Sequence, residues 1–143
     1  MYLLNTLNHK SRNVFLLGAS ALGSLVLTTA VMAEDFTITS GTTTNDDNTI
    51  NGNDTLTVIG ALVTSGVNNG IDTTAGSNKI TVSTESSITT SGASAYGIAN
   101  FGDSNDTTMA GSITTKGDSG IGIHHTGHKN TTAITGSITT KGS

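Results

Sequence analysis

The chain has no cysteine, proline or tryptophan among its 143 residues, and aromatic residues make up only 3% of it. The absence of cysteine excludes a disulfide-stapled mini-protein, a zinc module with thiolate ligands and a c-type haem protein. Charged residues are also scarce, at 11%, and the net charge is −4. This balance argues against nucleic-acid binding, which needs clustered lysine and arginine.

Four small or polar residue types make up just over half of the chain: 28 Thr, 18 Gly, 16 Ser and 13 Asn. Threonine, asparagine and glycine are poor helix formers, so a helical bundle is disfavoured. The same composition is typical of a disordered low-complexity linker. The order of the residues must therefore decide between a fold and a linker.

Residues 1–33 have the layout of a Sec signal peptide. A polar, basic stretch around Arg12 precedes an uncharged apolar run, and the small residue Ala33 stands at the end. We predict cleavage between Ala33 and Glu34, which leaves residues 34–143, with ten acidic and four basic residues, as the exported part. The alternative is an uncleaved membrane anchor, because 21 uncharged residues separate Arg12 from Glu34. Glycine, serine and threonine dilute that run, which favours cleavage.

A repeat of about 25 residues runs through the exported part. Residues 111–117 and residues 136–142 both read GSITTKG. Residues 86–92 read SSITTSG, and residues 60–66, at an offset of 26, read GALVTSG. A random linker has no reason to keep an apolar residue in register over successive copies, so self-similarity at this spacing indicates a solenoid.

Two other segments repeat at the same offset. Residues 96–98 (YGI) correspond to residues 121–123 (IGI), and residues 105–109 correspond to residues 130–134. Residues 53–56 (NDTL) form an earlier relative of the second segment. The repeat therefore extends over the whole period and not only over the heptapeptide.

Within each repeat the pattern has a period of two, which predicts strands. Ser112, Thr114 and Lys116 are expected to point outward, and Ile113 and Thr115 inward. Glycine and asparagine punctuate the stretches, as tight turns require: Gly92, Asn100, Gly102, Gly117, Gly127 and Gly142. About 25 residues supply three short strands and three turns, and stacked coils pair at about 4.8 Å. The sequence therefore predicts an all-β fold, a parallel β-helix of about four rungs.

Like residues of successive coils are expected to stack inside this helix. Two regular rows and a third, less regular one are predicted: Leu62, Ile88, Ile113 and Ile138; Ile71, Ile98 and Ile123; and Val58, Val82, Met109 and Ile134. Inward threonines are expected to fill the remaining sites, with their hydroxyls finding partners. A strand containing Phe36 and Ile38 is expected to cap the first rung.

Over about residues 48–143 the chain resembles the passenger region of a bacterial type V autotransporter. The resemblance is carried by the export signal, the G-S-I-T-T-x-G repeats, the Gly-Ile units and the Asn-Thr-Thr segments. It implies a right-handed β-helix at the cell surface or outer membrane, or outside the cell, of a Gram-negative bacterium. The sequence departs from this pattern because it lacks a C-terminal barrel and stops inside a repeat at Ser143, without a capping repeat. We therefore expect a truncated or fragmentary reading frame.

The histidine cluster His124, His125 and His128 suggests a surface metal site. Adjacent residues of a strand point to opposite faces, however, and no carboxylate or thiolate lies near in the sequence to complete a ligand set. We expect these histidines to be exposed turn residues and assign no metal or other cofactor.

Six aspartates could mimic the acidic groups of β-helical polysaccharide lyases and hydrolases: Asp46, Asp47, Asp54, Asp103, Asp106 and Asp118. Such chemistry needs carboxylates that converge within about 5–10 Å. Asp103 and Asp106 lie in a turn-like stretch, where aspartate commonly bonds its own backbone. No Gly-x-Ser-x-Gly elbow frames a serine nucleophile, and no catalytic residue is assigned.

The leading hypothesis is an exported, non-enzymatic β-helix, an adhesin or structural stalk. Its expected partners are a protein or glycan on a host or neighbouring cell and, through the signal peptide, the export machinery. The alternatives are a fragment of a β-helical polysaccharide-active enzyme and a non-functional remnant of a longer autotransporter gene.

Overall fold

A computed structural model of the chain describes residues 33–39 and 48–143. The predicted signal peptide, apart from Ala33, lies outside these residues. The described part forms a parallel β-solenoid of about four coils, with strands and turns and no helix. No helix within it is long and apolar enough to cross a membrane. The all-β solenoid predicted from the repeat is thus confirmed.

The strands belong to three parallel sheets. Sheet A contains β1 (Asp35–Ile38), β3 (Thr55–Val58), β6 (Lys79–Val82), β9 (Asp106–Met109) and β12 (Thr131–Ile134). Sheet B contains β4 (Ala61–Thr64), β7 (Ser87–Thr90), β10 (Ser112–Thr115) and β13 (Ser137–Thr140). Sheet C contains β2 (Asn48–Ile50), β5 (Ile71–Thr73), β8 (Tyr96–Phe101) and β11 (Ile121–Thr126).

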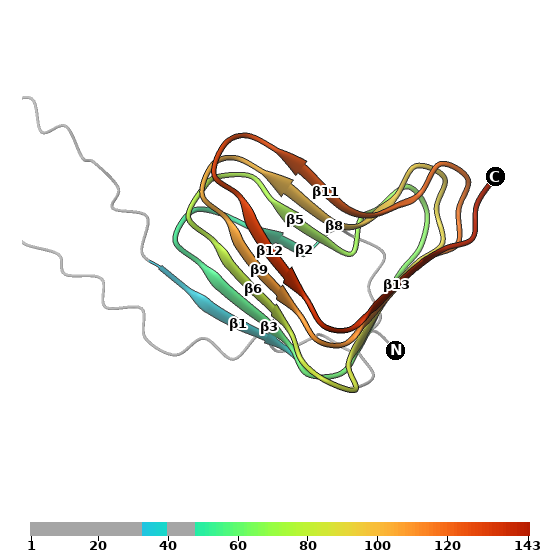
Figure 1. Ribbon diagram of the computed structural model, residues 1–143, viewed down its shortest axis with the longest axis horizontal. Helices are drawn as coiled ribbons and strands as arrows, with labels where there is room; N and C mark the ends of the chain where they lie inside the picture. The colour runs from blue at the N-terminus through green and yellow to red at the C-terminus, as the bar shows by residue number, and fades with distance from the viewer. Residues whose placement is uncertain (1–32, 40–47) are drawn as a thin grey trace, which may run out of the picture. The chain divides into compact units, whose positions relative to one another are not determined.

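Each complete coil contributes one strand to each sheet, and successive coils lie side by side in the order of the chain (Figure 1). Residues one coil apart are direct neighbours across a sheet: Ile113 pairs with Ile88 on one side and with Ile138 on the other. Most backbone groups are therefore hydrogen-bonded between coils, which explains how a chain with so few apolar residues can fold.

Apolar residues stack in continuous rows inside the solenoid. In the register of the sheets, the rows are Leu62, Ile88, Ile113 and Ile138 in sheet B; Ile71, Ile98 and Ile123 in sheet C; and Ile38, Val58, Val82, Met109 and Ile134 in sheet A. Members in the middle coils, such as Ile88 and Met109, are fully buried. Sheet A carries a further inward row that the sequence reading missed, in which Phe36, Leu56 and Ile80 give way to Thr107 and Thr132.

The expected alignment of residues 53–56 with residues 105–108 is wrong by one position. Val58 pairs with Val82, and Val82 pairs with Met109. This register places Asp54, and not Asn53, level with Asn105. The apolar side chains, which must stay inside, set the register, and the turn residues follow.

The prediction from the sequence that Asn100 marks a turn is wrong. It lies inside β8 and is fully buried. Its amide nitrogen Nδ2 donates to the hydroxyl of Thr107 at 3.0 Å, so the amide is held by an inward side chain of the neighbouring sheet. Its carboxamide oxygen Oδ1 is buried and has no hydrogen-bond partner among the described residues, so the side chain is satisfied only through its nitrogen.

Inward threonines fill sheet B next to the isoleucine row, but their hydroxyls are only partly satisfied. Thr64 donates to the carbonyl oxygen of Asn68 at 3.3 Å. The hydroxyls of Thr90 and Thr115 are buried and have no hydrogen-bond partner among the described residues. The expectation that each inward hydroxyl finds a partner is therefore wrong for these two residues, although the register places both in a row of threonines.

The turn that enters sheet A has the same unusual backbone in successive coils. Its left-handed residues have φ between 60° and 66°: Asn53, Ser77, Ser104 and Lys129. In each case the next residue is an asparagine or aspartate whose side chain can bond the backbone. That side chain compensates for the backbone strain of a residue other than glycine in this region.

Candidate functional site

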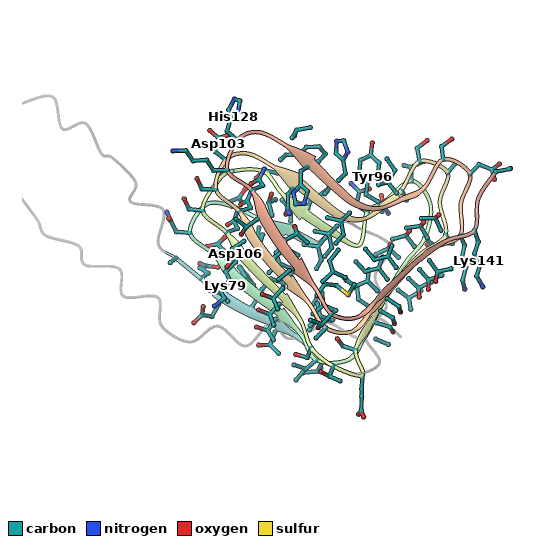
Figure 2. The ribbon with its side chains drawn as sticks, viewed as in Figure 1. Lys79, Tyr96, Asp103, Asp106, His128 and Lys141 are labelled. Carbon is teal, nitrogen blue, oxygen red and sulfur yellow. The ribbon has the colours of Figure 1, made fainter. Side chains whose placement is uncertain are left out.

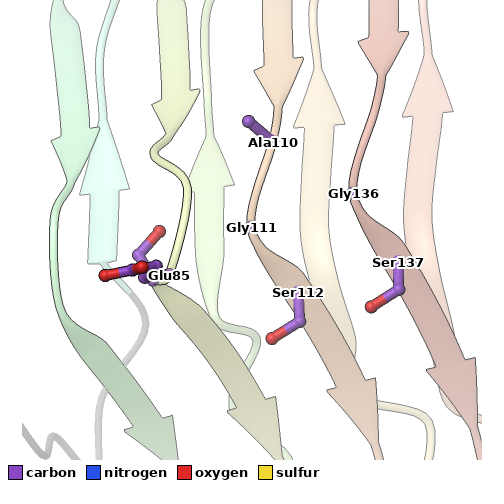
Figure 3. A pocket seen from close by; sticks show the side chains of 7 residues that line it. Glu85, Ala110, Gly111, Ser112, Gly136 and Ser137 are labelled. Atoms are coloured by element: carbon purple, nitrogen blue, oxygen red, sulfur yellow. The ribbon is translucent and has the colours of Figure 1, made fainter.

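A shallow groove of about 340 Å³ follows the corner between sheets A and B (Figure 3). Its lining is almost entirely small and polar, with a single carboxylate: Glu85, Ser86, Ala110, Gly111, Ser112, Gly136 and Ser137. The groove runs across successive coils, so its lining residues recur at the coil spacing of about 4.8 Å.

The groove arises from a turn of unequal length. Four residues separate β6 from β7, whereas two residues make the corresponding turn between β9 and β10 and between β12 and β13. The longer turn places Glu85 in a left-handed conformation, with φ of 66°. Ser86 closes it through bonds from its amide and its hydroxyl to the carbonyl oxygen of Ser83.

Glycine is required at the floor of the groove. A Cβ at Gly111 would lie 2.6 Å from the carbonyl oxygen of Ser83, and one at Gly136 would lie 2.7 Å from that of Ala110. Both positions are too close for a real side chain. Glycine at these two positions therefore lets the backbones of adjacent coils approach each other closely.

Sheet B extends the groove with two outward rows of hydroxyls. They stand on three adjacent strands, in the register of the sheet: Ser87, Ser112 and Ser137 in one row, and Thr89, Thr114 and Thr139 in the other. In the preceding coil the same positions hold Ala61 and Val63. The hydroxylic face therefore begins at the coil that carries Glu85, beside the groove.

The three histidines do not form one site. His124 and His125 lie in β11, which corrects the expectation that they are turn residues, whereas His128 lies in the following turn. The ring of His124 stacks on Tyr96 with centroids 4.8 Å apart, on the outside of sheet C; Figure 2 shows Tyr96 pointing away from the interior. No group of three potential metal ligands occurs within the described residues.

The exposed side chain of His125 extends the Asn100–Thr107 contact to the last coil. Asn100 Nδ2 lies 3.1 Å from His125 Nδ1, and Thr132 Oγ1 lies 2.8 Å from His125 Nε2. Because an amide nitrogen only donates, Nδ1 accepts and Nε2 carries the proton of the neutral ring. Burial and, secondarily, the nearby His124 lower the pKa of His125 below its usual 6.5.

The aspartates considered for catalysis act as local hydrogen-bond acceptors between coils. Asp103 accepts from the amide of His128 at 2.7 Å, Asp106 from the hydroxyl of Thr131 at 2.7 Å, and Asp118 from the amide of Ser143 at 3.4 Å. Asp54 accepts from the amides of Glu34 and Asn51 at 2.9 and 2.8 Å. Asp46 and Asp47 lie outside the described residues.

A row of amide side chains joins the turns that enter sheet A. The carboxamide oxygen of Asn78 accepts from the amide of Asp54 at 3.1 Å, that of Asn105 from Asn78 at 3.0 Å, and that of Asn130 from Asn105 at 2.8 Å. Asn105 matches the N-glycosylation pattern, but it is fully buried and so bonded. The row is structural.

Sequence reasoning missed Glu85 and the groove, although a signal was present. In three coils, the last inward residue of the sheet A strand lies four positions before the first inward residue of the next sheet B strand. Met109 and Ile113 are one such pair. Between Val82 and Ile88 the separation is six. That difference of two marks the longer turn.

Comparison with known proteins adds no relative to this picture. No family model, curated protein or solved structure matches the chain.

Proposed function

We propose that the chain is an exported, non-catalytic β-solenoid of the autotransporter-passenger type, whose groove and hydroxylic face bind an extended polar ligand on another cell, a glycan in the first instance. The observation that carries the proposal is the continuity of the Glu85 groove with the serine and threonine rows of sheet B. The signal-peptide pattern of residues 1–33 supports export.

The chemistry of this surface matches a glycan. Hydroxyls of serine and threonine both donate and accept, as sugar hydroxyls do, and Glu85 adds a carboxylate acceptor at one end. Short side chains on paired strands lose little conformational entropy when they bind. Contacts repeated at about 4.8 Å along the solenoid suit a chain-like ligand that makes many weak bonds.

Binding of the purified 143-residue chain to immobilised glycans tests the ligand. We expect Glu85→Gln and Thr114→Ala to weaken binding about 2–10-fold each, the loss of about 0.5–1.5 kcal/mol per hydrogen bond. Thr108→Ala is the matched control, because Thr108 is an outward threonine on sheet A, and it should leave binding unchanged. An equal loss of binding in Thr114→Ala and Thr108→Ala would refute the site. Release of new reducing ends from the glycan would support the enzymatic alternative.

Export is tested separately, in a Gram-negative bacterium that expresses the chain. Fractionation should find the protein outside the cytoplasm, and N-terminal sequencing should begin at Glu34. Ala33→Arg should leave the precursor uncleaved. A cytoplasmic product with an intact N-terminus would contradict export without bearing on the glycan site.

A further inference from the structure

Two lysines form a short row along one edge of the hydroxylic face of sheet B. Lys116 directly follows β10, and Lys141 directly follows β13. The amide of Lys116 donates to the carbonyl oxygen of Thr90 at 2.9 Å, and that of Lys141 donates to Thr115 at 2.9 Å. Both lysines therefore continue the parallel ladder of the sheet, and they are neighbours across successive coils at about 4.8 Å.

The lysine side chains lie on the same side of the sheet as the hydroxyls. Outward and inward positions alternate along β10, so Lys116 follows Ser112 and Thr114 on the outer face. Lys116 is exposed although β7 and β13 flank β10 on both sides. Figure 2 shows Lys141 pointing away from the interior. The lysines therefore add a third outward row to this face.

No described carboxylate neutralises the positive charge of this row. Neither ammonium group forms an ion pair within the part of the chain that the structure describes. Asp118, the acidic residue closest to Lys116 in the sequence, accepts instead from the amide and the hydroxyl of Ser143. Like charges side by side across a sheet repel each other. An anion between the two lysines would relieve this repulsion and accept charge-assisted hydrogen bonds from both.

The opposite edge of the face carries the opposite charge. Glu85 precedes the serine row, whereas the lysines follow the threonine row. Four residues at about 3.3 Å each place Lys116 about 13 Å beyond Ser112. Salt at about 0.1 M screens much of the repulsion between Glu85 and an anion at that distance. The face therefore offers an acidic group a place at one edge and offers sugar hydroxyls the remainder.

We infer that the glycan bound by this face is an acidic polysaccharide, whose carboxylate or sulfate groups lie against Lys116 and Lys141. Its hydroxyls contact the serine and threonine rows, so the inference rests on the proposed function. Residues 34–143 contain ten acidic and four basic residues, and the chain as a whole therefore does not attract a polyanion. The attraction is local to the lysine row, and it selects an acidic glycan over a neutral one.

Binding of the purified 143-residue chain to matched pairs of glycans tests this selectivity. Polygalacturonate with its methyl ester tests carboxylate, and dextran sulfate with dextran tests sulfate. We expect at least one acidic form to bind about tenfold more tightly than its neutral partner, and to bind less tightly as salt rises. Equal affinity within both pairs would overturn the inference, as would an equal affinity for single-stranded DNA.

Removing charge locates the binding. The double variant Lys116→Gln, Lys141→Gln should lose about tenfold in affinity for the acidic glycan and keep its affinity for the neutral partner. The double variant Lys79→Gln, Lys129→Gln is the matched control, because it removes the same charge from exposed lysines outside this face. Equal losses in the two double variants would overturn the inference.

Thr114→Ala distinguishes a failure of this inference from a failure of the proposed function. A neutral glycan that binds as tightly as the acidic one, and more weakly to Thr114→Ala, would overturn the inference and leave the proposed function standing. Binding of the acidic glycan that depends on the lysines but not on Thr114 would overturn the proposed site.

Discussion

At the scale of single residues, the solenoid is held by polar side chains that bond across coils. Asn105 illustrates this role: its carboxamide oxygen accepts from the amide of Asn78, and its Nδ2 donates to the carbonyl oxygen of Gly102 at 3.3 Å. The residue is fully buried, so water cannot replace these bonds. Buried polar groups of this kind fix the height of each turn relative to the next.

Replacing Asn105 should therefore destabilise the fold according to which bonds are lost. We expect Asn105→Ala to lower the free energy of unfolding by about 1–3 kcal/mol, because the buried amide of Asn78 loses its acceptor. Asn105→Asp keeps an acceptor, as Asp54 does naturally in the same row, and should cost less. Urea unfolding followed by circular dichroism measures both, and equal losses would contradict the hydrogen-bond explanation.

The side chains whose roles could be read from the sequence are those that obey the repeat. Ile113 could be placed inside because its copies recur at a fixed offset. Asn100 and His125 could not be placed, because their environment depends on Thr107 and Thr132 in another sheet. Glu85 could not be found in this way, because its longer turn occurs once among the described coils and therefore has no copy with which to align.

At the scale of elements, glycines at the start of sheet C strands allow the interior to close. Cβ atoms built on Gly70 and Gly97 would overlap Ile88 and Ile113, respectively, on the facing sheet B, and each would also approach the carbonyl oxygen of the next coil's glycine. The Gly-Ile pattern was visible in the sequence. The reason for its glycine was not, because the clash is with a strand from a different part of the coil.

Gly97→Ala should cost about 1–3 kcal/mol of stability, the usual result of overpacking a filled core. Its Cβ would press on both Ile113 and the backbone oxygen of Gly122, which lies 2.5 Å away. Gly122→Ala is the matched comparison, because its Cβ would meet only the side chain of Ile138. That side chain is 38% exposed and free to move, so the loss should be smaller. Thermal unfolding compares the two, and a reversed order would contradict this account of the packing.

At the scale of the whole molecule, the stacking of coils follows from the period, whereas the turns between strands do not. A period of about 25 residues fixes three parallel sheets once the two-residue alternation is recognised, since each strand can pair only with its copies. The apolar rows dominate the register. Consequently the predicted alignment of Asn53 with Asn105, which matched the polar residues of the two turns, is wrong by one position.

A solenoid of this kind should tolerate the loss of one whole period better than the loss of a part of one. Deleting residues 112–136 joins Gly111 to Ser137, which restores the sequence GSITTKG and removes one coil without changing any turn. We expect a folded, cooperatively unfolding protein that retains the strand signal in circular dichroism and has a lower free energy of unfolding, because one interface between coils is lost. Deleting residues 112–131 removes five residues fewer but moves Ile138 out of its row, so the last strand cannot pair in register and this chain should have a lower free energy of unfolding than the full-period deletion. A shorter deletion that is at least as stable as the full-period deletion, or an unfolded protein after loss of the full period, would show that the coils are not the independent stacking units from which the molecule is built.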